Sequence, residues 1–177
     1  MTARIVARLA VLIAVAATLQ IAEGLIPKPL PWLRLGLANG VTLLVIVRLG
    51  AGAALGVAVA RVVMGGLVLG TFGGPAFVLS AAGSAAAWLV MAASWRRLAP
   101  PLSLLGVSVL GSAAHVAGQL VALGAVLGVG RGVLALAPVL AATAVPLGLV
   151  TGAVILAVHR RLPPWEIRGT LAPSSDR

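Results

Sequence analysis

Long apolar runs with almost no charge are the feature that most limits how this chain can fold. Only 9% of its 177 residues are charged, 61% are hydrophobic, and the mean hydropathy is +1.16. An ordinary soluble domain carries about 25% charged residues, so this chain has too few to cover a water-soluble surface. We therefore predict an integral membrane protein.

The apolar runs predict helices. A transmembrane β-barrel is disfavoured, because the chain lacks alternating apolar and polar positions and only 3% of its residues are aromatic, too few for two interfacial girdles. A spanning helix needs about 20 apolar residues. We predict an all-α bundle of six transmembrane helices, of which the second is short: Ile5–Ile26, Leu35–Leu49, Gly52–Gly70, Ala76–Trp95, Leu102–Leu127 and Val133–Val158.

The predicted domain organisation is a transmembrane domain over 1–160 and a polar, disordered cytoplasmic tail over 161–177. Pro27, Pro29 and Pro31 end the first span, and Gly73-Gly74-Pro75 separates the third from the fourth. The first span has features of a signal peptide, but its apolar stretch is long for one and five more spans follow.

Basic residues predict the orientation. With six spans, nine arginines fall on the side of the termini, against Lys28, Arg34 and Arg131 on the other side. Cytoplasmic loops collect the excess of Lys and Arg, so we expect a multi-pass protein of the bacterial plasma membrane with both termini in the cytoplasm. The basic residues that give the net charge of +10 then determine the topology and contact anionic membrane lipid. Nucleic acid is not expected as a partner.

Several kinds of chemistry are not expected. The chain has no cysteine, which removes thiol catalysis and thiolate metal sites. Glu166 and Asp176 lie in the tail, far from Glu23, so no pair of carboxylates is available for catalysis, and we expect no cofactor and no metal. No ATP-binding motif is present, so any ATP-driven step must come from a partner.

Polar residues inside predicted spans carry the functional prediction, because they are costly in lipid and usually face the protein interior. Gln20 and Glu23 are three residues apart, and His115 and Gln119 are four apart, so each pair shares one face of its helix. The candidate substrate-binding residues are Arg61, His115, Gln119, Asn39, Glu23 and Gln20. Together they would line a polar cavity for a small anionic or aromatic molecule. The alternative is structural: His115 would join two helices, and Arg61 would pair with Glu23 or a helix C-terminus.

Small residues also allow two readings. Gly65-Gly66, Ala10 with Ala14, and Gly111 with Gly118 form small faces on three predicted helices. Such faces let helices approach closely within one bundle, or they provide a docking face for a partner membrane subunit.

Three stretches resemble a known family. Leu35–Leu44 (LGLANGVTLL) resembles the "KLGLAN-x-VTLL" stretch of the Gx transporter family, which is also labelled heptaprenyl diphosphate synthase component I. Arg61–Gly66 with Gly70–Pro75 resembles its "R-x-x-x-G … G-x-x-x-G-P" segment. Gly106–Gln119 resembles its "G-x-S-x-x-G-A-x-x-H-N-x-G-Q" segment, with Val116 in place of the usual Asn, which weakens that polar cluster. The resemblance covers roughly residues 5–160.

The resemblance implies a six-helix protein similar to the substrate-binding S components of energy-coupling-factor transporters, which work with a membrane coupling subunit and ATPases. We predict a noncatalytic transport subunit for a small molecule. Two alternatives stay open: a noncatalytic subunit of a flavin- or quinone-linked redox complex, and a component of heptaprenyl diphosphate synthesis for the menaquinone side chain.

Overall fold

The computed structural model of the chain contains six helices in the residues that it describes. It describes residues 3–26, 36–98, 102–127, 132, 135, 137–163 and 165. The helices are α1 (Ala3–Leu25), α2 (Leu37–Leu49), α3 (Ala51–Val68), α4 (Pro75–Leu98), α5 (Leu104–Leu127) and α6 (Ala137–Arg161). The all-α prediction is confirmed, and the helix bounds differ from the predicted spans by a few residues. Of the predicted tail, only residues 161–163 and 165 are described, and Arg161 ends α6.

Five of the six helices are long and apolar enough to cross a membrane: α1, α3, α4, α5 and α6. The chain is therefore a multi-pass membrane protein. α2 is different, because its 13 residues rise only about 20 Å against a hydrocarbon core of about 30 Å. The second predicted span is thus a short helix, as expected.

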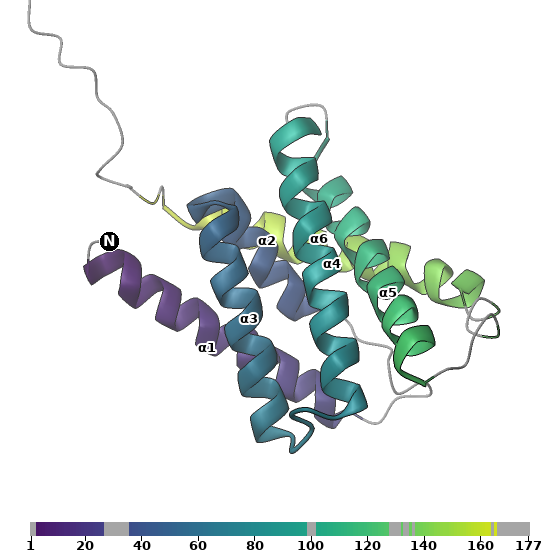
Figure 1. Ribbon diagram of the computed structural model, residues 1–177. Coiled ribbons are helices and arrows are strands. Elements are labelled where there is room, and N and C mark those ends of the chain that lie inside the picture. The colour runs from purple at the N-terminus through teal and green to yellow at the C-terminus, as the bar shows by residue number, and fades with distance from the viewer. Residues whose placement is uncertain are drawn as a thin grey trace, which may run out of the picture.

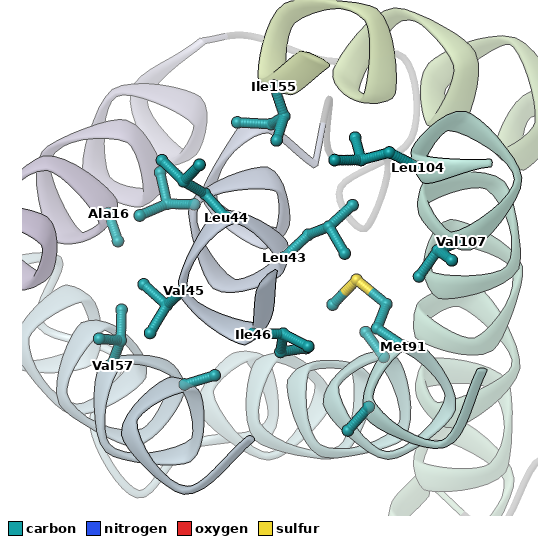
Figure 2. Close-up of a cluster of buried hydrophobic side chains, with 14 residues drawn as sticks. Ala16, Leu43, Leu44, Val45, Ile46, Val57, Met91, Leu104, Val107 and Ile155 are labelled. Carbon is teal, nitrogen blue, oxygen red and sulfur yellow. The ribbon is translucent and has the colours of Figure 1, made fainter. Parts of the chain in front are cut away.

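The short helix α2 lies at the centre of the bundle. It contacts all five other helices, and every residue from Ala38 to Ile46 is buried. Figure 2 shows its side chains radiating into the core, with Leu43 directed toward Met91 and Leu104 and Val45 toward Val57. A helix that is apolar all round is expected in such a fully buried place.

The other helices surround α2. Figure 1 shows α3, α4 and α5 side by side with α2 behind them, and α1 packs on α2 and α3. α6 packs on α5 and α2.

α6 begins at Ala137, so Pro138 stands in its first turn, where a proline is tolerated. Pro146 lies inside α6, where it removes one backbone hydrogen bond of the helix.

Glycines set the closest helix contacts. A Cβ atom at Gly118 on α5 would lie 2.7 Å from the carbonyl oxygen of Ala82 on α4. A Cβ at Gly148 on α6 would lie 2.7 Å from Cα of Val109 on α5. These glycines therefore pack helices within one bundle. Ala10 and Ala14, by contrast, are exposed on α1.

Candidate functional site

A buried arginine joins four helices. Arg61 on α3 is only 3% exposed. Its Nη1 donates a hydrogen bond of 2.7 Å to Oε1 of Gln20 on α1, and its Nη2 donates to Oδ1 of Asn39 on α2 and, at 2.7 Å, to Oγ of Ser84 on α4. These three acceptors are neutral oxygens, which suit the planar fork of a guanidinium.

Asn39 extends this network to α5. Its amide nitrogen lies 3.0 Å from Nδ1 of His115. A guanidinium can only donate, so Asn39 must turn its oxygen toward Arg61 and its NH2 group toward the imidazole. His115 therefore accepts at Nδ1 in this arrangement. We call Gln20, Asn39, Arg61, Ser84 and His115 the Arg61 cluster, and all five side chains are buried.

Two glycines make room for the cluster. A Cβ at Gly65 on α3 would lie 2.6 Å from Nε2 of Gln20. A Cβ at Gly83 on α4 would lie 2.8 Å from Cε1 of His115 and 2.9 Å from Cγ of Gln119. Neither position can take a larger residue unless a polar side chain moves. Gly83 also shows that His115 and Gln119 face α4 together, as their spacing predicts.

The cavities beside the cluster are small. One of about 20 Å³ is lined by Asn39, His115 and Gln119 together with residues of α5 and α6. Another of about 10 Å³ also has Asn39 and Ser112 in its wall. A single water needs about 10–15 Å³ by this measure. The polar lining of the larger cavity suits one water, but neither cavity holds an organic ligand in this conformation. On the lipid side, a groove of about 240 Å³ between α3 and α4 has Ser84 in its wall.

Glu23 has a separate place. It is 4% exposed near the end of α1, and its carboxylate accepts hydrogen bonds from the backbone amides of Leu37 at 2.9 Å and Gly36 at 3.4 Å. Gly36 precedes α2 with φ of 81° and supplies no side-chain cap of its own. The carboxylate from α1 thus caps the first turn of α2, where a negative charge is favourable.

The structure therefore brings four of the six candidate residues into one network, namely Gln20, Asn39, Arg61 and His115. Gln119 is buried one turn beyond His115, and Glu23 anchors the start of α2. Sequence reasoning missed Ser84, and also Ser80, whose hydroxyl accepts from Gln20 at 3.4 Å. A signal was available, because the two serines are four residues apart in an apolar helix, as His115 and Gln119 are.

The chain matches one sequence family. The sequence model of the family described as Heptaprenyl diphosphate synthase component I matches residues 12–158, which include the whole Arg61 cluster. Comparison with curated proteins and with solved structures finds no match. Since the match covers most of the chain, the protein belongs to the heptaprenyl diphosphate synthase component I family.

Proposed function

We propose that this chain is a noncatalytic membrane subunit that binds a small anionic molecule at the Arg61 cluster and moves it across the membrane with partner subunits. The observation that carries the proposal is the buried guanidinium of Arg61, held by side chains of α1, α2 and α4. Ionisable residues inside a membrane are rare, face the protein interior or a cavity, and mark substrate and ion pathways. Amide, hydroxyl and imidazole groups around it add the directional contacts that recognition needs.

The described conformation is the closed state of this site. A ligand larger than water needs the cavity of about 20 Å³ to grow. Leu140 and Ala144, in the first half of α6, form part of its wall. Pro146 follows them and leaves the carbonyl of Ala142 without its usual helical donor. We propose that α6 bends at Pro146. The first half of α6 then moves away from α2 and α5, which enlarges the cavity.

Partner subunits are part of the proposal. The family description names a component, which is consistent with a multi-subunit system. On α1, Ala10 and Ala14 are exposed four residues apart, and small residues let a second helix approach closely. We propose this face for a membrane coupling subunit that works with ATPases.

The test is native mass spectrometry of the tagged protein purified from its own membranes in mild detergent. We expect a retained small molecule with wild type, its loss with Arg61→Gln, and its retention with Arg97→Gln, which removes the same charge from an exposed site at the end of α4. Equal retention by both variants would refute the binding role of Arg61. Size-exclusion chromatography of each variant is the control for folding.

A second candidate function is favoured by the family to which the chain belongs. This function is that of an accessory subunit of heptaprenyl diphosphate synthesis. The same purification separates the two candidates: an ATPase pair with a coupling subunit supports transport, whereas a prenyltransferase, flavoprotein or quinone enzyme supports an accessory role. We propose no catalytic residue in either case, because Glu23, the one acidic residue before the tail, is already engaged in capping α2.

A further inference from the structure

A long apolar groove runs between α1 and α6, away from the Arg61 cluster. Both helices pack on α2, whose residues Val41 and Leu44 line the floor. The walls include Val11 and Val15 of α1 and Val154 and Val158 of α6, each 37% to 62% exposed. The groove has a volume of about 590 Å³, within the range of about 300–1,000 Å³ typical of ligand sites.

One end of this groove is cationic and aromatic. Arg8 and Trp165 line it there, and the Trp165 ring centroid lies 5.6 Å from Cζ of Arg8 and 5.5 Å from Cζ of Arg48. Arg48 is fixed in turn, since it donates to the carbonyl oxygens of Leu162 and Pro163 at the end of α6. The indole ring therefore holds Arg8 beside the mouth of the groove.

More positive charge gathers at the same end. Arg4 is exposed one turn before Arg8, and the last turn of α6 carries Arg160 and Arg161. Tryptophan and arginine concentrate where a membrane helix meets the lipid headgroups. The groove thus has its charged end at headgroup level and its apolar length at the level of the acyl chains. An apolar partner helix would make no use of these cations, whereas an anionic amphiphile would use both parts.

We propose that the groove binds a bilayer phospholipid with an anionic headgroup, with one acyl chain lying between α1 and α6 and the phosphate beside Arg8. Basic pockets between membrane helices recognise anionic headgroups in this way. The lipid lies over Val41 and Leu44 of α2, where the groove separates α1 from α6, and so completes the packing around the central helix. This inference does not rest on the proposed transport function.

The test is native mass spectrometry after equilibration in mixed micelles of phosphatidylglycerol and phosphatidylcholine at equal amounts. We expect wild type to retain the anionic lipid about fivefold over the zwitterionic one, which corresponds to about 1 kcal/mol for a basic residue at the headgroup. Arg8→Gln should abolish this preference. The control Arg97→Gln, with the same charge change at the end of α4 and away from the groove, should keep it.

A second variant tests the groove itself. Val154→Trp would fill part of the wall and should reduce retention of both lipids, while Leu110→Trp on the exposed face of α5 should not. Equal retention of the two lipids by wild type, or the same preference in Arg8→Gln as in wild type, would overturn the proposal. Displacement of the retained lipid by an equal amount of an isoprenoid diphosphate would also overturn the proposal. The groove would then be a binding site for the isoprenoid diphosphate instead of a phospholipid.

Discussion

The carboxylate of Glu23, near the end of α1, accepts a hydrogen bond of 2.9 Å from the backbone amide of Leu37, the first residue of α2. The first turn of a helix has amides without intrahelical partners, which need acceptors when they are buried. Most helices use a Ser, Thr, Asp or Asn at the N-cap for this. Here Gly36 occupies that position with positive φ, and a residue from the preceding helix takes over the task.

Replacing Glu23 should therefore destabilise the start of α2. We expect Glu23→Ala to cost about 0.5–2 kcal/mol of stability, as loss of a helix cap does. Glu23→Gln should cost less, because its amide oxygen can still accept one hydrogen bond. Hydrogen exchange at the amides of Leu37 and Ala38 measures the effect, with faster exchange in the order wild type, Gln, Ala. Unchanged exchange in the alanine variant would refute the capping role.

Arg61→Lys should weaken the bundle although it keeps the charge. One ammonium cannot reach acceptors on α1, α2 and α4 with the geometry of the guanidinium fork. Hydrogen bonds to charged groups are worth about 1.5–3 kcal/mol each, so losing one of the three should lower the thermal unfolding midpoint measurably. Arg97→Lys, at an exposed position, is the matched control. Equal midpoints for the two variants would show that the fork geometry is unimportant.

Much of this arrangement could be predicted from the sequence, because apolar length and helix breakers determine where membrane helices lie. The polar side chains inside them also identified Arg61, His115, Asn39 and Gln20. These residues are recognisable because a polar group inside lipid is costly unless it faces the interior. The membership in the family, recognised from three short stretches, was confirmed by the match over residues 12–158.

The rest depends on packing that the sequence does not display. In a membrane both the lipid and the protein interior are apolar, so hydrophobicity does not tell which face of α4 turns inward. Ser84 was missed, although its four-residue spacing from Ser80 marks the inward face. The pairing of Glu23 with the backbone of α2 could not be foreseen either, since it depends on how the end of α1 meets a helix that starts at Leu37. Substrate binding by the six candidate residues stays a prediction.

Arg48 should hold the end of α6. Its Nε donates to Nδ1 of His159 at 3.0 Å, and its Nη atoms donate to carbonyl oxygens of the last turn and the residues after it. Arg48→Gln should let this turn fray. Because the site is partly exposed, we expect a modest loss of about 1 kcal/mol, or roughly fivefold faster hydrogen exchange at the amide of Leu162. Arg97→Gln should leave that amide unchanged, and equal exchange rates in the two variants would refute the role of Arg48.

A matched pair of glycines on α5 tests the close contact with α4. A Cβ at Gly118 would lie 2.7 Å from the carbonyl oxygen of Ala82, whereas a Cβ at Gly124 would meet no other atom within 4 Å. Gly118→Ala should therefore force the two helices apart and cost about 1–3 kcal/mol by overpacking. Gly124→Ala should be neutral or stabilise by up to about 1 kcal/mol through its higher helix propensity. Thermal unfolding midpoints in one detergent compare the two variants with wild type. If both alanines raise the midpoint, α4 and α5 do not approach as closely as the structure shows.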